Sequence, residues 1–555
     1  MRKMENSRQI EITQFRTLLN SIEKEGYSKA VNNFLRNNSD FRSRFDSKEG
    51  NIGFRAITKK SCRCLIINSD LGNIPECLSQ SFDQVFSLDD DEKISIQEYR
   101  FNEKGIKNIN LVKNESEIDS FPENYFDLII VNRLYHNSRN DILRFLERIK
   151  QILDKNGCLC LGLDNKLGIK ISQQEEDEKC YVSTFEGYTK ILKSVGFQIA
   201  AFWALPSFDR LHYSGRMDDD ISLKWFFQNF DRKFLVDGKY KMIGRFLKLF
   251  NKTARKFFLE KFSPSFIFYC YFEESPKTLE DMIKDNFKFK NLILHPRMNK
   301  IMYFLLDEKG NPRKVVTCKP TTYSLDEIIV PVNRIFPNMR NPDEKMIVEE
   351  WEEGRPLDRF DDEGIEITMK WLTEFQKKSK GEKLSNEEIE YETTNVRNEL
   401  ANIEIMRELP YQKWLNEYKD EIKDRNLEKT GVHGDFQVRN ILVDHNRKKA
   451  NIIDWDWRFQ EQGNPLYDYV WLATSMMMIS SNPVEEFSKN YKKTDGIMKS
   501  IKIIKDTMRK NFHTELNFIK LQRFMIMRFI TIRIKDGDEG YMTYVKILEK
   551  ILEND

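Results

Sequence analysis

The chain has 555 residues, too many for one ordinary hydrophobic core, so about two to four domains are expected. Its 40% apolar and 32% charged residues suit globular folding with a soluble surface. With 90 basic against 88 acidic residues, the net charge of +2 gives no electrostatic ground for binding nucleic acid. The eight cysteines form no CxxC pair and mostly lie in strand-like apolar runs, which favours reduced core residues over disulfides or zinc ligands.

Residues 1–55 are polar and favour helix, with Phe15, Leu18 and Ile22 at helical spacing. No apolar stretch opens this segment, so no secretory signal is expected, and the apolar runs elsewhere are too short to span a membrane. We therefore expect a cytoplasmic protein. The aromatic and basic segment 241–262 indicates either a packing helix or a helix that lies on a membrane surface.

From Cys62 to about Phe202, short apolar runs alternate with longer amphipathic segments such as Ile142 to Leu153. This alternation predicts parallel strands separated by helices, which is a doubly wound α/β sheet. The predicted strands are residues 64–67, 84–88, 126–131 and 158–161.

Two segments of this region resemble class I S-adenosylmethionine-dependent methyltransferases. Residues 121–129 are similar to the fourth strand of that family, and residues 153–158 to the turn before its fifth strand. Residues 163–169 are similar to a segment of methyltransferases from surface-polysaccharide gene clusters. The resemblance implies a Rossmann-like methyltransferase fold with S-adenosylmethionine as its cofactor.

The resemblance also implies where the cofactor binds. The turn 68–73 after the first strand carries one glycine, Gly72, where the family has three that let the backbone approach the cofactor. Asp89, at the end of the second strand, is expected to bind the ribose hydroxyls, and Glu115 to meet the adenine side. Since Ile66 stands where the family often has an acid, the domain is either a working methyltransferase or a retained scaffold that binds a substrate or partner.

We place the methyltransferase-like domain at residues 56–275, with an insertion around 205–262 that forms a lid or an acceptor-binding element. The three consecutive acids 218–220 in the insertion indicate either a cation site or a solvated turn. Beyond the boundary, the apolar runs 301–306 and 315–319 predict a β-hairpin.

Near the C-terminus, the run 432–444 contains His433-Gly434-Asp435 and Asn440, and Asp454 follows after a second apolar run. The apolar residues 441–443 and 452–453 predict a hairpin that brings Asn440 and Asp454 together at its strand ends. A carboxylate beside an attacking hydroxyl and two oxygen ligands for magnesium are the groups that phosphoryl transfer requires. A surface hairpin with incidental acids is the alternative.

The pattern H-G-D, four residues and N, then I-D-W, resembles the catalytic loop and metal-binding segment of the aminoglycoside phosphotransferase and choline kinase family, which has the protein-kinase fold. The resemblance implies that Asp435 orients or deprotonates an acceptor hydroxyl, while Asn440 and Asp454 hold Mg²⁺ on the phosphates of ATP. It assigns structural roles to His433 and Asp468.

A phosphotransferase of this kind needs a small nucleotide-binding lobe before its catalytic loop. Lys319 ends the second strand of the predicted hairpin, where the family lysine contacts the phosphates, and Glu327 is its expected partner. The segment 346–357 resembles the hinge strand, so its residues are expected beside adenine: Glu349, Glu350 and Trp351.

The expected chain is thus a helical extension (1–55), a Rossmann-like α/β domain (56–275), and a bilobal protein-kinase-like α+β domain with a small lobe (276–355) and a large helical lobe (356–555). We expect an ATP- and magnesium-dependent phosphotransferase acting on a hydroxyl of a small molecule or glycan, fused to a methyltransferase, in surface-polysaccharide or lipid modification. A catalytically degenerate scaffold is the alternative, favoured by glycine-poor turns at 68–73 and 295–299. Gly434 disfavours a protein kinase.

Overall fold

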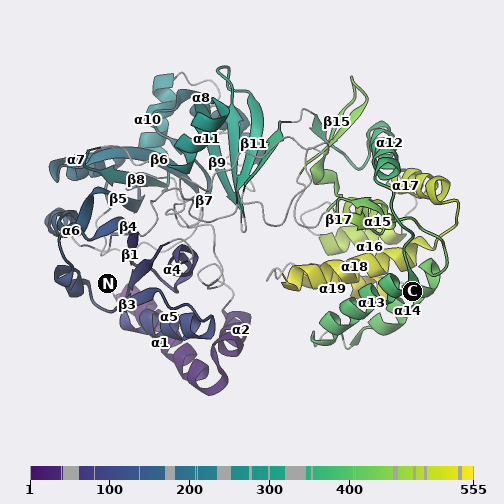
Figure 1. Cartoon of the computed structure of the whole chain (residues 1–555), viewed down its shortest axis with the longest axis horizontal. Coiled ribbons are helices and arrows are strands. Elements are labelled where there is room, and N and C mark those ends of the chain that lie inside the picture. The colour runs from purple at the N-terminus through teal and green to yellow at the C-terminus, as the bar shows by residue number, and fades with distance from the viewer. Residues whose placement is uncertain are drawn as a thin grey trace. The chain divides into compact units, whose positions relative to one another are not determined.

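A computed structural model shows two compact units, Met1–Asn333 with Lys345–Trp351, and Arg334–Glu344 with Glu352–Asp555 (Figure 1). The structure describes residues 2–38, 41, 45, 62–79, 82–134, 136, 138–168, 182–206, 208, 211–233, 252–273, 278–297, 300–318, 346–351, 354–403, 406, 408–453, 460–478, 483–492, 497–535 and 541–553.

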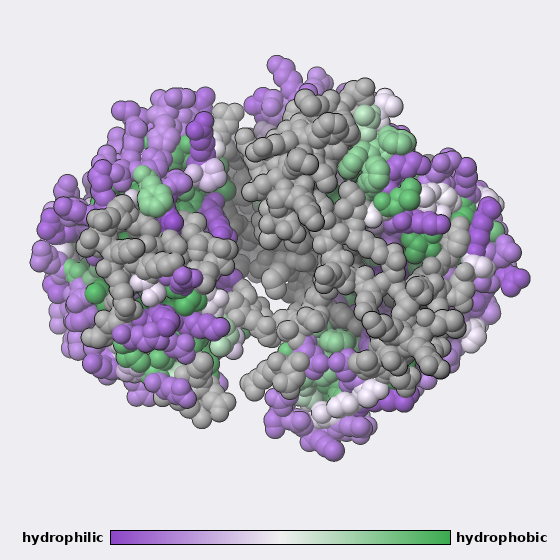
Figure 2. Space-filling view, turned by 180° about the vertical axis from the view of Figure 1, so that it is seen from behind, coloured by the Kyte–Doolittle hydropathy of each residue, from purple (hydrophilic) through white to green (hydrophobic). Residues whose placement is uncertain are grey.

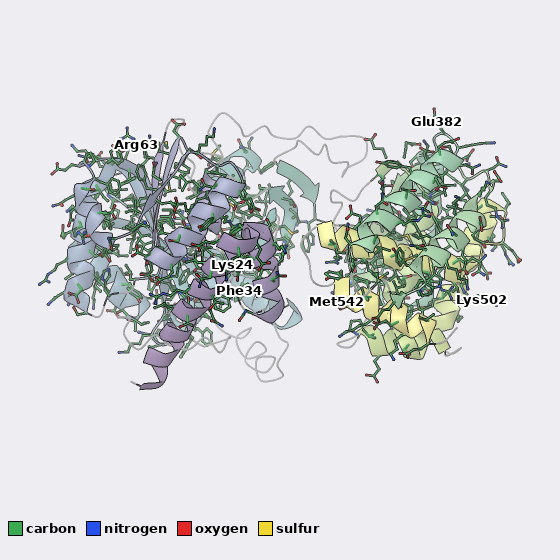
Figure 3. All side chains as sticks on the ribbon, turned by 90° about the horizontal axis from the view of Figure 1, so that it is seen from below. Lys24, Phe34, Arg63, Glu382, Lys502 and Met542 are labelled. Carbon is green, nitrogen blue, oxygen red and sulfur yellow. The ribbon has the colours of Figure 1, made fainter. Side chains whose placement is uncertain are left out.

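The first unit opens with two helices, α1 (Arg2–Glu25) and α2 (Tyr27–Asn37). Phe15 and Ile22, whose spacing predicted a helix, are buried on one face of α1. They belong to a core that includes Leu71 and Ile96 of the α/β part, so the N-terminal helices pack onto it. Phe34 of α2 is among the side chains labelled in Figure 3.

A twelve-stranded sheet organises the first unit, in the order β12-β11-β10-β9-β7-β6-β8-β5-β4-β1-β2-β3. Its strands are β1 (Arg63–Ile67), β2 (Gln84–Leu88), β3 (Ile109–Val112), β4 (Phe126–Asn132), β5 (Leu153–Asp164), β6 (Gln198–Pro206), β7 (Leu211–Arg216), β8 (Ser265–Tyr271), β9 (Asn291–Arg297), β10 (Lys300–Leu306), β11 (Pro312–Cys318) and β12 (Met346–Glu350).

The end β3-β2-β1-β4-β5 of this sheet is parallel, as the sequence predicted. The connecting helices are α4 (Asn73–Leu78), α5 (Asp91–Glu103), η3 (Glu115–Ser120), α6 (Arg139–Ile152) and α7 (Phe185–Ser194). The strand order reverses between β1 and β4, and open α/β sheets bind ligands at the carboxyl ends of strands beside such a point. This edge is therefore where a cofactor site is expected.

The other end of the sheet is antiparallel. β8 lies between β5 and β6, and β7 joins β6 to β9 through the pair Ser214 and Leu294. β9, β10, β11 and β12 follow as a meander in which β10 and β11 form the predicted hairpin. One hydrophobic core contains Ile66 of β1, Ile267 of β8 and Tyr303 of β10. The sheet thus continues past residue 275 without a break in its core.

The insertion contributes β7 and two helices, α8 (Asp220–Lys233) and α10 (Lys252–Phe262), and α11 (Leu279–Phe287) follows it. Its three consecutive acids are each engaged with neighbouring groups. Asp218 pairs with Arg216 at 3.0 Å, and Asp220 pairs with Arg255 at 3.5 Å. Asp219 accepts hydrogen bonds from the backbone N–H and the hydroxyl of Ser222. Ion pairs and hydrogen bonds within the chain therefore hold the three acids in the turn that leads into α8.

The second unit is mainly helical, with short strands around one loop. Its elements are β13 (Arg355–Pro356), α12 (Asp362–Lys378), α13 (Asn386–Ala401), α14 (Tyr411–Ile422), β14 (Thr430–Val432), η5 (Val438–Asn440), β15 (Ile441–Asp444), β16 (Lys449–Ile452), β17 (Gln460–Gly463), α15 (Leu466–Met477), α16 (Pro483–Lys492), α17 (Ile497–Phe512), α18 (Phe518–Lys535) and α19 (Tyr541–Leu552). Every residue of α15 is buried, so this helix is the centre of the unit's core.

Among the described residues, no helix is long and apolar enough to cross a membrane. In Figure 2 the coloured surface is mostly hydrophilic, with apolar residues in separate patches. Phe257 and Phe262 of α10 are exposed, and Leu259 between them packs into the core. The described part of segment 241–262 is therefore a packing helix that also presents two aromatic rings to solvent.

Candidate functional site

The loop formed by residues 433–440, here called the 433–440 loop, connects β14 to β15 in the second unit. Gly434 has φ +79°, a left-handed conformation that glycine adopts without steric cost. The chain therefore turns sharply before Asp435, whose side chain is only 5% exposed.

Both carboxylate oxygens of Asp435 accept hydrogen bonds from side chains. The indole N–H of Trp471, on α15, donates to Oδ1 at 3.1 Å. The amide of Gln437 donates to Oδ2 at 3.0 Å. The rotation of this carboxylate is thus set by donors on both sides.

Asn440 lies directly against Asp435. Its Nδ2 donates to the backbone oxygen of Asp435 at 2.9 Å and approaches Oδ2 at 3.4 Å. Since the amide nitrogen faces Asp435, the amide oxygen Oδ1 points elsewhere, and it accepts no hydrogen bond among the described residues. An amide oxygen held in this way is a suitable ligand for Mg²⁺.

The predicted hairpin after Asn440 is formed by β15 and β16, with Ile441 opposite Ile452. The backbone N–H of Ile453 donates to the backbone oxygen of Asn440 at 2.9 Å. This bond places the residue before Asp454 beside Asn440, while Asp454 itself lies outside the described residues. Convergence of the two proposed metal ligands remains a prediction.

His433 and Asp468 hold the backbone of the 433–440 loop. Nδ1 of His433 accepts the N–H of Asp435 at 3.2 Å, so Nε2 must carry the proton that it donates to the backbone oxygen of Ile453 at 3.1 Å. This neutral tautomer has no ring nitrogen left to act as a base. Asp468 accepts the N–H groups of His433 and Gly434, and burial raises its pKa although these N–H groups oppose the shift.

The strands expected to form the nucleotide lobe are β9 to β12 of the first unit. Glu349 and Glu350 lie on β12 opposite Val315 and Lys314 of β11. Trp351 follows, and its N–H donates to the backbone oxygen of Arg313 at 2.7 Å.

Two of the expected nucleotide contacts lie outside the described residues. They are Lys319, directly after β11, and Glu327. Their roles, like those of the three residues at the end of β12, stay predictions.

At the carboxyl edge of the parallel strands, the turn after β1 takes the left-handed conformation at alternate residues. The values of φ are +59° at Asn68, +54° at Asp70 and +88° at Gly72. They lie in the turn for which the resemblance implied three glycines. Asn and Asp are the non-glycine residues that most readily adopt this conformation, so the backbone turn is kept with one glycine.

Asp89, at the end of β2, already accepts three hydrogen bonds. The N–H of Asp70 donates to Oδ2 at 2.6 Å, and Oδ1 accepts the N–H of Asp90 and Nζ of Lys93, both at 2.8 Å. Burial raises the pKa of Asp89, although the Lys93 ammonium acts in the opposite direction. A carboxylate has about four acceptor positions, so the site fits one ribose hydroxyl of a cofactor but a second would have to displace Lys93.

Glu115 opens η3 after β3. Its carboxylate pairs with Arg148 of α6 at 3.4 Å and is largely exposed. Among the described residues, no hydrogen bond or ion pair joins it to Gly72 or Asp89. Burial lowers the pKa of nearby His136, although Glu115 opposes that shift.

Sequence reasoning missed three residues that complete these sites: Gln437, Trp471 and Lys93. Gln437 lies within the motif, and its short distance from Asp435 along the chain was a usable signal. Lys93 stands four residues after Asp89, in the first turn of α5, and this short spacing was a usable signal. Trp471 lies 36 residues from Asp435 and carried no local signal.

Comparison with protein families matches both halves of the chain. Residues 353–501 match the model described as the phosphotransferase enzyme family, and residues 70–161 match a methyltransferase domain. The chain carries two transferase domains. The 433–440 loop and its hairpin lie within the phosphotransferase domain, and Asp89 and Glu115 lie within the methyltransferase domain. A comparison with curated proteins gives no match.

Solved structures similar to the chain include methyltransferases. An S-adenosylmethionine-dependent methyltransferase from Aquifex aeolicus is 20% identical, with 30% of this chain and 86% of that chain covered and a TM-score of 0.25. A second structure is phosphoethanolamine N-methyltransferase 2 of Haemonchus contortus, in complex with phosphomonomethylethanolamine and S-adenosylhomocysteine. It is 14% identical, with 43% of this chain and 53% of that chain covered and a TM-score of 0.26. The family matches, rather than these structures, identify the two domains.

Proposed function

We propose that the phosphotransferase domain transfers a phosphoryl group from ATP to a hydroxyl of a small molecule or glycan. The observation that supports this most is the pairing of Asp435 with Asn440. A buried carboxylate held by two side-chain donors stands beside an amide whose oxygen is turned away from it. In this proposal Asp435 orients the acceptor hydroxyl and accepts its proton.

The remaining contacts of the proposal follow the resemblance. Asn440 and Asp454 would hold Mg²⁺, and Lys319 with Glu327 would hold the phosphates. Glu349, Glu350 and Trp351 at the end of β12 would lie beside adenine. Bound Mg²⁺ supplies charge neutralisation on the phosphates. A location in the cytoplasm, where ATP is supplied, is part of the proposal.

The test is the turnover of ATP with Mg²⁺ over a panel of sugars, amino alcohols and glycans. Asp435→Asn keeps the shape of the side chain but removes the base, so we expect turnover to fall by at least about a hundredfold. Asp444→Asn is the matched control, because Asp444 lies at the opposite end of β15 and accepts the N–H of Arg447. Equal activity of the two variants would reject the proposal.

We also propose that the methyltransferase domain uses S-adenosylmethionine, on the same or a related acceptor, in the modification of surface polysaccharide or lipid. The left-handed turn at Asn68, Asp70 and Gly72 and the carboxylate of Asp89 support a cofactor site at this edge of the sheet. Calorimetric titration with S-adenosylhomocysteine tests it. Asp89→Asn is expected to weaken binding, since the amide offers one acceptor oxygen in place of two.

A catalytically silent nucleotide-binding scaffold is the second candidate for the chain. It is favoured by the three internal hydrogen bonds that engage Asp89, since they leave little acceptor capacity for a ribose. Titrations with ATP plus Mg²⁺ and with S-adenosylmethionine distinguish the candidates. Heat in neither titration would favour the scaffold, and heat in both would reject it.

A further inference from the structure

Trp471 makes a direct hydrogen bond to Asp435, the residue that we propose orients the acceptor hydroxyl. Its indole N–H lies 3.1 Å from Oδ1 of Asp435, and its side chain is 2% exposed. We propose that Trp471 is a positioning residue, whose N–H holds Asp435 in the orientation that phosphoryl transfer needs. This inference rests on the proposed function of the phosphotransferase domain.

The indole of Trp471 is itself fixed by aromatic packing. Its ring stacks on Phe529 of α18, with the ring centroids 3.4 Å apart and the planes 11° from parallel. Tyr544 of α19 packs on both rings, at 6.0 Å from Trp471 and 6.2 Å from Phe529. Since α15 is buried along its whole length, the ring has no room to turn. The helices α18 and α19 therefore determine where the N–H points.

The N–H, rather than the ring alone, carries the role. A carboxylate that is almost fully buried needs hydrogen-bond donors, because an unpaired buried oxygen carries a desolvation cost. Phenylalanine at position 471 would keep an aromatic ring against Phe529 but would leave Oδ1 of Asp435 without this donor. The carboxylate would then rotate toward the amides of Gln437 and Asn440, which hold Oδ2.

The kinetic test compares Trp471→Phe with Trp414→Phe in the full chain. Trp414 of α14 is equally buried and packs under Arg523, so its variant loses the same volume without removing the indole donor to Asp435. The probe is ATP with Mg²⁺ and the same acceptor panel, measured as formation of ADP. We expect Trp471→Phe to lower kcat about tenfold with an unchanged KM for ATP.

Trp414→Phe is expected to keep the kcat and the KM for ATP of the unaltered protein. Identical kinetics of the two tryptophan variants would overturn the inference. Asp435→Asn separates this result from failure of the proposed function. If Asp435→Asn keeps full turnover, the proposed function fails; if it loses turnover while Trp471→Phe keeps it, only the positioning role fails.

A spectroscopic measurement tests the contact without relying on turnover. The chain has eight tryptophans, so ¹⁵N labelling gives eight indole N–H signals in a TROSY spectrum, and Trp471→Phe identifies the one of interest. We expect Asp435→Asn to move that signal upfield by more than any other indole signal, because the donor loses its charged acceptor. An unmoved signal would overturn the inference even in a preparation with no measurable turnover.

Discussion

The buried carboxylate of Asp468 fixes the backbone from which Asp435 projects. It accepts two successive N–H groups, those of His433 at 2.9 Å and Gly434 at 3.1 Å. Both donors precede Asp435 directly, so the direction of its side chain depends on a residue that touches no reacting group. Asp468 therefore acts on the site through the main chain, which fits the structural role that the resemblance implied.

Asp468→Asn should separate this role from catalysis. An amide offers one acceptor oxygen, so one loop N–H would lose its partner, at a cost of about 1–3 kcal/mol in the free energy of unfolding. We expect urea denaturation to show this loss and kcat to fall, while the affinity for ATP stays unchanged. A stable variant with full kcat would contradict the assignment.

Glu76 of α4 makes the stability of the first unit depend on pH. Burial would raise its pKa, but the cations of Arg100 and Lys104, at 2.6 Å each, outweigh this and lower the pKa. The folded state then binds fewer protons than the unfolded state. This contribution is present above the ordinary pKa of 4.5 and is lost as pH falls through the lowered value.

We therefore expect Glu76→Gln to reduce the fall in melting temperature between pH 6 and pH 3. Glu98→Gln on the exposed face of α5 is the matched control and should melt like the unaltered chain at each pH. Parallel melting curves for both variants would show that the cluster around Glu76 does not contribute.

Local sequence was enough to select Asp435 and Asn440 as candidate site residues. Both belong to one short motif, and the apolar runs after it predicted the hairpin that follows. The donor on Trp471 could not be predicted in the same way. Its contact depends on how α15 packs against α18 and α19, and no periodicity in α15 distinguishes one buried face from another. Residues that hold a reactive group from a distant helix are found by structure.

At the scale of elements, the turn after β1 shows how side chains replace glycines. Ser69, Ser87 and Gln97 form a buried network in which Gln97 donates to the hydroxyl of Ser69 at 2.9 Å and to the backbone oxygen of Asp70 at 2.6 Å. The hydroxyl of Ser87 donates its one proton to Oε1 of Gln97 at 2.7 Å and accepts from the hydroxyl of Ser69 at 2.8 Å. Helix α5 thereby holds the turn in its left-handed form, and Asn68 adds a bond from its amide to the backbone oxygen of Arg133.

Gly72 is the position in this turn that cannot be replaced. A Cβ there would lie 2.8 Å from the ring of Phe101, in addition to the strain of φ +88°. Gly105 is the matched control, because it has φ +67° and no atom within 4 Å of a Cβ. We expect Gly72→Ala to destabilise the protein by about 1–3 kcal/mol more than Gly105→Ala, measured by chemical denaturation. Equal destabilisation would mean that Phe101 simply moves aside.

The glycine count of the turn was read from sequence as a weakness of the cofactor site. The structure shows that Asn68 and Asp70 adopt the left-handed backbone without glycine, and that the N–H of Asp70 and Nζ of Lys93 engage Asp89. Four of the parallel strands, β1, β2, β4 and β5, and the hairpins β10–β11 and β15–β16 followed from apolar runs and turn residues. Which polar groups engage Asp89 depended on tertiary packing and could not be read from them.

At the scale of the whole molecule, the strands expected to serve the phosphotransferase share their cores with the methyltransferase domain. β9 and β10 contribute Ile293 and Phe304 to a cluster that also contains Leu159 of β5 and Phe268 of β8. β9 pairs with β7, and β7 with β6, so backbone hydrogen bonds link the same strands. The first unit should therefore unfold as one cooperative body.

Hydrogen exchange in rising urea tests this cooperativity. We expect peptides from 291–318 to lose protection together with those from 153–164 and 265–271. Peptides from α12 to α19 should lose protection separately, since they belong to the second compact unit. Loss of protection at 291–318 in step with those helices would show that β9 to β11 unfold with the second unit instead.

Sequence gave no sign of this continuity, because a strand's own residues do not say which sheet edge it joins. For gene fusion and module exchange, the consequence is practical. A recombination point before Asn291 would separate β9 to β12 from the rest of the twelve-stranded sheet. A point after Trp351 would keep that sheet intact. A chimaera that is to contain β9 to β12 together with the second unit should therefore also include the rest of the first unit's sheet.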